Sequence, residues 1–479
     1  MALAGVVLWS LSGVLHPIMV QLQPEPVRQQ LDPRVLTLNN TVDPRPLLRA
    51  AGLATIQDLR VIEVDGRPAY QVTRLRGEQR LVFDARDGSI VPDGERRYAE
   101  WLARQFTGEP RARVAHADLV TTFGSEYSYI NRLLPVWRIE FDRPDHLRAF
   151  VDTRAGRLGT LVDDRHALAA GAFNALHRWL WLAEVARAVR LVLLTAMLTM
   201  AVLVVGIGIW IYALRWRHAA GRWGLRRAHR VAGLGAVIAG VILPLSGGTH
   251  LVYEVLRGDA ASRAPQPEDP IAVDDLHITP EAAQLGAGGH VSAISLARLG
   301  SEPAYRLLLV ESLESGPRPG AGHTHHESSP SGRVTAGFNP ERGRFVWVST
   351  RDGHIMDRAE KSYMVARALR VVGVVPTGGL QLIEHFDGEY GFVFKRLPVW
   401  RVEFQGGIGV FVDPADGAIA AITDSGDRAE QWLFAHVHKL EWLVGWIGGT
   451  WRDRLAMTLA AVLGVSAVLG GVLALRRRS

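Results

Sequence analysis

The sequence predicts an α+β membrane protein, in which an internal duplication supplies four transmembrane helices and two extracytoplasmic α+β lobes. The main observation is a repeated string, because residues 134–141 read LPVWRIEF and residues 397–404 read LPVWRVEF. A second string, LSGxxH, begins at Leu11 and again at Leu245, in the same order relative to the first string. Internal repeats define the architecture of a chain before any local pattern does. We therefore interpret the 479 residues as two related halves.

Four apolar stretches approach the roughly 20 residues that a helix needs to cross the hydrocarbon core of a bilayer. They cover residues 2–20, 191–213, 231–253 and 455–475. The first stretch could be mistaken for a secretory signal peptide, but it lacks a basic leader and a small-residue cleavage site. Because it shares LSGxxH with an internal stretch, we expect it to be retained as the first of four spans.

The distribution of arginine sets the expected orientation in the membrane. The segment from Arg215 to Arg230 holds six arginines and no acidic residue, and residues 476–478 are all arginine. Short basic segments next to a span stay in the cytoplasm. We therefore expect both termini in the cytoplasm of a bacterium, with residues 22–175 and 256–432 outside the inner membrane. These nine arginines exceed the net charge of +6, so the basic balance reflects topology and requires no nucleic-acid surface.

The chain contains no cysteine, and this limits its chemistry. Disulfides, iron–sulfur clusters, thiolate zinc sites and thioether-linked haem are excluded, so a redox metal must be held by histidine or carboxylate. The sequence also lacks a recognisable Walker loop, dinucleotide-binding loop, HExxH helix or GxSxG elbow. Nucleotide chemistry and nucleophilic hydrolysis are therefore unsupported.

A unit of strand, turn and strand occurs twice in each segment that we place outside the membrane. Each unit begins with a proline-led run of alternating apolar and polar residues, which is typical of a half-buried strand. An acidic residue and a glycine follow, and they predict a turn with positive φ at the glycine. Apolar residues at helical spacing predict helices over 96–106 and 359–371. The units cover residues 68–90, 135–158, 303–355 and 398–419.

The order of these units and the flanking spans resembles the PepSY-associated transmembrane family over nearly the whole chain. The resemblance implies a bacterial inner-membrane protein with PepSY-type lobes outside, in a family often linked to iron uptake. Some members are reductases that release iron from siderophores with b-type haem, whereas other PepSY proteins are inhibitory or regulatory modules. One departure concerns the basic lead that includes His229, because its partner in the first half would precede Met1. Either the start codon is assigned too late or the first half has lost this residue.

The repeat and the resemblance together predict seven regions. His177 and His438 are expected to open helices that lie along the outer membrane surface before the second and fourth spans. The regions are transmembrane helix 1 at 1–21, PepSY-like region 1 at 22–175, an interfacial helix with transmembrane helix 2 at 176–214, a cytoplasmic basic loop at 215–230, transmembrane helix 3 at 231–255, PepSY-like region 2 at 256–432, and an interfacial helix with transmembrane helix 4 at 433–476.

Four histidines occupy matching positions next to the membrane in the two halves. His16 and His250 end the two LSGxxH strings, while His177 and His438 follow the second repeat at the same distance from Phe150 and Phe411. Ionisable residues within a span are costly and are usually functional. A histidine at the interface can instead cap a helix or bond to a carbonyl, but the repetition favours ligands. Their number matches two bis-histidine haem b groups, with the pairing left open. We predict His16, His177, His250 and His438 as axial ligands of haem iron.

Other histidines are weaker candidates. His229 could bind an inner haem with His218, but a position beside phospholipid is favoured because the first half has no equivalent. The run His-Thr-His-His at 323–326 lies in a Gly, Pro and Ser-rich insertion. Such a run can bind Zn, Cu or Ni weakly, although chance histidines in a solvated loop are favoured. His436 is a spare ligand candidate.

These features lead to one functional hypothesis and two rivals. The first is a haem b protein that passes electrons outward to a ferric siderophore or another small iron chelate. The cytoplasmic part is too short for a nicotinamide or flavin domain, so membrane quinol or a redox partner must supply the electrons. One rival is a non-enzymatic sensor, regulator or assembly factor that binds a peptide or protein. The other is a metal-handling protein that uses the tract at 323–326.

Overall fold

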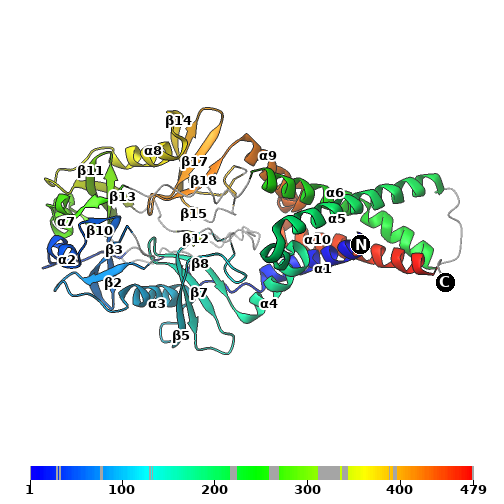
Figure 1. Cartoon of the computed structure of the whole chain (residues 1–479), viewed down its shortest axis with the longest axis horizontal. Helices are drawn as coiled ribbons and strands as arrows, with labels where there is room; N and C mark the ends of the chain where they lie inside the picture. Colours follow the sequence, from blue (N-terminus) through cyan, green and yellow to red (C-terminus); the bar gives the residue numbers. More distant parts are fainter. Residues whose placement is uncertain are drawn as a thin grey trace.

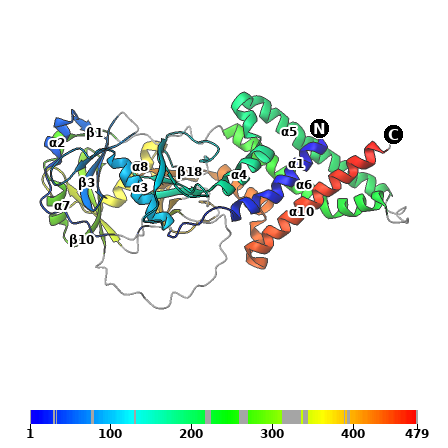
Figure 2. The same cartoon turned by 90° about the horizontal axis from the view of Figure 1, so that it is seen from below.

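The computed structural model shows an elongated molecule, with a helix bundle at one end and strands at the other (Figure 1). Figure 2 shows the same separation from a perpendicular direction. The helices α4 and α9 lie between the two parts. The structure describes residues 2–28, 31, 34–75, 79–128, 131, 133–215, 224–257, 269–310, 335–336, 343–387, 389–391 and 396–476.

Four helices of the bundle are long and apolar enough to cross a membrane, so the predicted number of spans is confirmed and the chain is a multi-pass membrane protein. In the bundle, α6 packs against α5 and α10, and α1 also packs against α10. The helices are α1 (Ala2–Gln21), α5 (Leu180–Arg215), α6 (Leu225–Arg257) and α10 (Val444–Leu475).

Three of these helices begin earlier than the apolar stretches suggest. The helix α5 starts at Leu180 and α10 at Val444, well before residues 191 and 455, and α6 starts at Leu225, before residue 231. A non-helical residue interrupts each of the first two, Ala186 in α5 and Gly448 in α10. Gly448 has a φ of 77°, which a residue with a side chain adopts only with strain. Hydropathy alone detects the part of each helix that crosses the membrane and misses the more polar turns that precede it.

The first lobe, residues 44–162, contains the predicted strands and turns. The proline-led run at 68–72 lies in β3, and the helix predicted over 96–106 is α3. The elements are α2 (Pro44–Ala50), β1 (Thr55–Ile56), β2 (Asp58–Val64), β3 (Arg67–Thr73), β4 (Leu81–Asp84), α3 (Gly94–Thr107), β5 (Val114–Val120), β6 (Val136–Phe141), β7 (Arg148–Asp152) and β8 (Arg157–Val162).

The second lobe, residues 271–423, has a similar succession of elements, but β9 precedes α7 and two short strands, β12 and β15, are additional. The helix predicted over 359–371 is α8, and the repeated string at 397–404 covers β16 as the string at 134–141 covers β6. The elements are β9 (Ile271–Ala272), a 3-10 turn (Val273–Asp275), α7 (Pro280–Ala287), β10 (His290–Leu299), β11 (Glu302–Val310), β12 (Thr335–Ala336), β13 (Gly343–Ser349), α8 (Ala359–Val372), β14 (Pro376–Ile383), β15 (Arg396–Leu397), β16 (Val399–Phe404), β17 (Ile408–Val412) and β18 (Ile419–Thr423).

The two lobes share a sheet and a core at the end far from the bundle. One six-stranded antiparallel sheet has the order β13-β11-β10-β2-β3-β4, and Val61 of β2 pairs with Ile294 of β10. These residues belong to one cluster of buried side chains that includes Leu59, Ile271 and Leu296. Each lobe also has its own four-stranded sheet, β5-β6-β7-β8 or β14-β16-β17-β18. The prediction of two lobes missed this shared sheet, because pairing between strands so distant in sequence leaves no local pattern.

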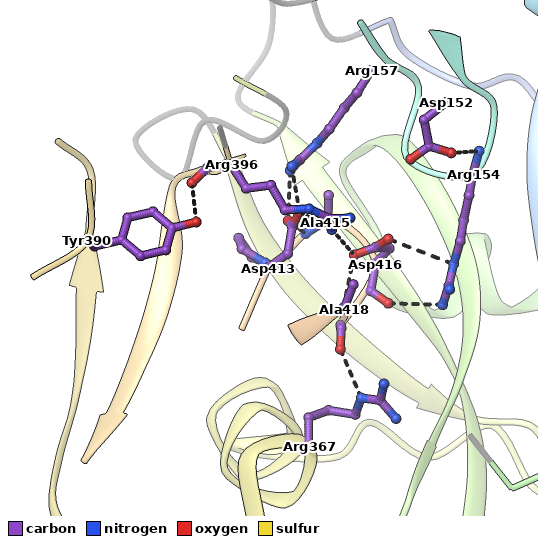
Figure 3. Close-up of polar contacts among 12 residues, drawn as sticks. Asp152, Arg154, Arg157, Arg367, Tyr390, Arg396, Asp413, Ala415, Asp416 and Ala418 are labelled. Carbon is purple, nitrogen blue, oxygen red and sulfur yellow. Dashed lines mark hydrogen bonds and ion pairs between the residues drawn. The ribbon is translucent and has the colours of Figure 1, made fainter. Parts of the chain in front are cut away.

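A buried network of charges joins the lobes closer to the bundle (Figure 3). Arg157 of β8 forms an ion pair with Asp413 at 2.5 Å, and the two side chains are 1% and 0% exposed. Arg396 lies 3.1 Å from Asp413 and 3.6 Å from Asp416, while Arg154 lies 3.8 Å from Asp416. The two acidic residues therefore sit among three guanidinium groups from both lobes.

The predicted acidic-glycine turns place these charges. Asp413 and Asp416 lie in the turn between β17 and β18, and Arg154 lies in the equivalent turn of the first lobe. Gly417 has a φ of 68°, and a Cβ there would come within 2.2 Å of the Tyr363 hydroxyl. Only glycine fits that position without displacing the tyrosine. The turns thus supply Asp413, Asp416 and Arg154, while Arg157 and Arg396 come from the strands β8 and β15.

Candidate functional site

Two π-helical turns lie where the strand-rich part meets the bundle. The helix α4 (Asp164–Phe173) continues into a π-helix at Asn174–Arg178, and α9 (Ser425–Leu433) continues into a π-helix at Phe434–His438. Each helix begins at an aspartate, Asp163 or Asp424, whose carboxylate accepts backbone N–H groups of the first turn. Short π-helical turns are rare and are often found at functional sites.

His177 and His438 lie at the ends of these turns, each beside a serine of an LSGxxH string. The distance from His177 Nδ1 to Ser12 Oγ is 2.9 Å, and the distance from His438 Nδ1 to Ser246 Oγ is 3.0 Å. The expectation that each histidine begins a surface helix differs from the structure, where each one ends a helix. The helices α1 and α6, which carry the LSGxxH strings, therefore contribute His16 and His250 and also contact His177 and His438 through their serines.

The serine contacts favour hydrogen on the Nδ1 nitrogen of each histidine. Ser12 Oγ also lies 2.9 Å from the Trp9 carbonyl oxygen, and Ser246 Oγ lies 2.7 Å from that of Ile242. Each hydroxyl has one hydrogen, which it donates to the carbonyl, so its oxygen accepts the hydrogen on histidine Nδ1. In a neutral imidazole the other nitrogen, Nε2, then keeps its lone pair. These contacts favour, for both histidines, the tautomer that binds a metal ion through Nε2.

A phenylalanine ring contacts both histidines of each half. Phe173 lies 5.1 Å from His16 and 4.9 Å from His177, measured between ring centroids. Phe434 lies 4.5 Å from His250 and 4.8 Å from His438. Each phenylalanine precedes its histidine by four residues, so both rings lie on one face of the helical turn. The four predicted histidines are therefore brought together in two matching groups.

The two histidines outside the spans are neutral at physiological pH. Burial is the main reason why the pKa of His177 is lowered to about 4, and His16 and Arg178 add to the effect. Burial also lowers the pKa of His438 to about 3, with smaller contributions from His177 and His250. An uncharged imidazole is the form that can act as a ligand.

The end of each π-helical turn is fixed by an arginine of the following helix. Arg190 Nε donates to the carbonyl of Arg178 at 2.7 Å, and Arg452 Nη1 donates to the carbonyl of Lys439 at 3.2 Å. Both carbonyls belong to the residue immediately after a histidine. These charge-assisted bonds restrain the backbone next to His177 and His438.

A comparison with protein-family models places this arrangement among known proteins. Residues 67–372, more than half of the chain, match the model of the PepSY-associated TM region. The chain belongs to the PepSY-associated transmembrane family. A search of curated proteins found no match. The resemblance noted from the strand and turn units is thereby confirmed.

The other histidines of this PepSY-associated chain have different surroundings. His229 Nδ1 lies 3.0 Å from the Ser466 carbonyl oxygen, so its ring contacts α10. His436 stacks on Trp432 at 4.7 Å, and its Nδ1 lies 2.9 Å from the carbonyl of that tryptophan. His218 and the tract at 323–326 lie outside the described residues.

The four bundle histidines do not form a compact cage for a single ion. Among the described residues, the one group of three or more potential ligands with all ligand atoms within 4.8 Å is Glu302, Asp352 and His354. That group lies in the second lobe, and two of its three residues are exposed. His16 and His177 share contacts with Phe173, and His250 and His438 share contacts with Phe434.

Sequence reasoning found the histidines but missed the residues around them. Ser12 and Ser246 were visible as part of LSGxxH, and their role as partners of His177 and His438 required the fold. Phe173 and Phe434 could have been found, because each stands four residues before a matched histidine. Glu430, which lies 2.5 Å from His250 Nδ1, has no such signal, since the first half carries no acidic residue at that position.

Proposed function

We propose that this chain is an inner-membrane haem b protein that passes electrons outward to reduce an extracytoplasmic ferric chelate. The observation that carries the proposal is the pair of serine contacts that leave Nε2 of His177 and His438 free to bind iron. His16 and His250 would supply the other axial positions. When bound, haem b supplies a reversible one-electron centre at its iron.

The residues on the protein side suit such a group. Buried, neutral imidazoles are the usual axial ligands of b-type haem. The hydroxyls of Ser12 and Ser246 orient the rings, and the rings of Phe173 and Phe434 supply apolar surface for a macrocycle. A donor set without thiolate also agrees with the absence of cysteine from the chain. Together these features support two haem groups held near one face of the bundle.

The proposed orientation follows from the arginines. Six arginines between residues 215 and 230 and three at 476–478 favour a cytoplasmic loop and cytoplasmic termini. Residues 22–175 and 256–432 are then extracytoplasmic, and they form the strand-rich part with its two PepSY-like lobes. The similar succession of elements, the two matched π-helical turns and the repeated strings support an origin of the halves by duplication.

The proposed substrate is a small ferric chelate such as a ferric siderophore. Oxygen donors hold Fe(III) more tightly than the softer Fe(II), so a gain of one electron weakens the complex and releases iron. Membrane quinol is the proposed donor, and its oxidation releases two electrons and two protons for every two ferric ions reduced. A redox partner protein could take its place. The basic loop at 215–230 is too short to hold a nicotinamide or flavin domain.

A difference spectrum of the purified full-length protein tests this proposal against its rivals. We expect protein expressed with haem available to show a Soret band, and dithionite to produce the α bands of reduced haem b. A protein without a Soret band would contradict the proposal and favour a sensor or assembly factor. Metal analysis of the same sample tests the third possibility, in which the tract at 323–326 binds Zn, Cu or Ni.

A further inference from the structure

The two histidine groups differ at one position, and the difference has a chemical consequence. His250 Nδ1 lies 2.5 Å from Glu430 Oε1, in a contact between α6 and α9. Glu430 stands eight residues before His438, and Ala169 stands eight residues before His177. Among the described residues, the His16 ring contacts Phe173 and has no hydrogen-bond partner. The second half therefore has a carboxylate where the first half has a methyl group.

The contact between His250 and Glu430 is partly buried. The side chains of His250 and Glu430 are 36% and 15% exposed, and Phe434, one helical turn after Glu430, stacks on the His250 ring at 4.5 Å. A carboxylate is an acceptor, so the hydrogen lies on Nδ1 of His250 and the lone pair on Nε2. The side chain thus fixes both the orientation and the tautomer of this imidazole.

A carboxylate bonded to a histidine also changes the ligand. The acceptor draws the Nδ1 hydrogen towards itself and makes Nε2 a stronger electron donor, as in the carboxylate–histidine pairs of metal sites. A stronger donor stabilises Fe(III) relative to Fe(II) and lowers the reduction potential of the iron. A neutral imidazole without this bond, such as that of His16, has no comparable effect.

We propose that Glu430 is a positioning residue that makes a haem held by His250 more reducing than a haem held by His16. This inference rests on the function proposed above. It gives the two related halves different roles, because an electron moves spontaneously from the centre of lower potential to the centre of higher potential. The second half then donates to the first, and an electron rests on the first-half centre.

A spectroelectrochemical titration of the haem-loaded full-length protein tests the inference. We expect two one-electron waves in the wild type. Glu430→Gln keeps the size and an acceptor oxygen but removes the charge, so the wave of lower potential should move to a more positive potential while the other stays. Ala169→Glu should move the second wave in the opposite direction, because it offers a carboxylate to His16.

Asp427→Asn is the matched control, since it removes the same charge from the same helix. Asp427 Oδ1 accepts a hydrogen bond from the Tyr253 hydroxyl at 3.0 Å, and its Oδ2 accepts one from the backbone N–H of Asp424 at 2.9 Å, so its replacement tests the loss of a charge from α9 at another position and should shift neither wave comparably. A shift for Glu430→Gln no larger than that of Asp427→Asn, or equal movement of both waves, would overturn the inference. If neither wave shifts with the Glu430 or the Ala169 substitution, the role of Glu430 is overturned but the proposed function stands. If the wild type shows no wave at all, the proposed function is overturned as well.

Discussion

Replacing His177 or His438 by alanine should remove about half of the haem from the purified protein, if each half binds its haem independently. An axial ligand cannot be lost without leaving the iron five-coordinate or releasing the haem. Replacement of a histidine that only bonds to a neighbouring hydroxyl would cost about 1 kcal/mol of stability and leave the spectrum unchanged. His16→Ala and His250→Ala should behave in the same way. The measurement is the haem content and reduced spectrum of each variant.

The controls lie close to the ligands or carry the same side chain. His436→Ala removes an imidazole two residues from His438, but this ring stacks on Trp432 and should be dispensable. His325→Ala and His326→Ala should also retain full haem. If all four proposed ligand variants kept wild-type spectra and haem content, the ligand assignment would be wrong, and His218, His229 and His436 would be the next candidates.

Replacing Asp413 by alanine should destabilise the association of the two lobes by about 3–5 kcal/mol. Arg157 and Arg396 both contact this carboxylate, and its loss leaves their charges buried without it. Burying an uncompensated charge costs far more than the loss of an exposed pair. The midpoint of thermal unfolding of the full-length protein in detergent, followed by tryptophan fluorescence, should fall markedly.

Asp274→Ala provides the comparison for this variant. Its partner is Arg49, and the two side chains are 75% and 60% exposed, so the expected cost is at most about 1 kcal/mol. Equal midpoints for the Asp413 and Asp274 variants would show that the buried network does not hold the lobes together.

The pH range for this comparison follows from the neighbouring carboxylate. Burial opposes the ionisation of Asp416, but Arg154, Arg396 and Arg157 outweigh it and hold its pKa well below the usual range. A depressed pKa gives stability that is present above the unfolded value of about 3.9 and is lost as the pH falls further. The charge of Asp416 therefore remains in place from neutral pH down to about pH 5, and the cost of Asp413→Ala should be similar across that interval.

Much of the fold could be predicted because its signals are local. Apolar length revealed the spans, and alternation after a proline together with an acidic-glycine turn revealed strands such as β6 and β16. The shared sheet could not be predicted, since the pairing of Val61 with Ile294 joins strands from opposite halves. The early starts of α5 and α10 were missed because charged residues between each helix start and the apolar stretch, such as Arg187 and Arg190 or Arg452 and Asp453, lower the hydropathy.

The candidate site was predictable only where the two halves agree. Repetition identified the four histidines, because chance does not place the same residue twice in matching strings. Glu430 was missed for the opposite reason, since Ala169 stands at its counterpart. The π-helical turns were also missed, because a π-helix differs from an α-helix by one residue per turn and leaves no clear mark on hydrophobic spacing. Features that distinguish the halves therefore required the structure.

Outward electron transfer is tested most directly in right-side-out membrane vesicles that contain the full-length protein. After the haem is reduced through the quinol pool, a membrane-impermeant ferric siderophore is added outside, and the α band is followed together with Fe(II) captured by a ferrous chelator. We expect the haem to be reoxidised as Fe(II) appears, and we expect no such reaction in inverted vesicles. Haem that stays reduced in right-side-out vesicles, or reoxidation confined to inverted ones, would contradict an outward-facing ferric reductase.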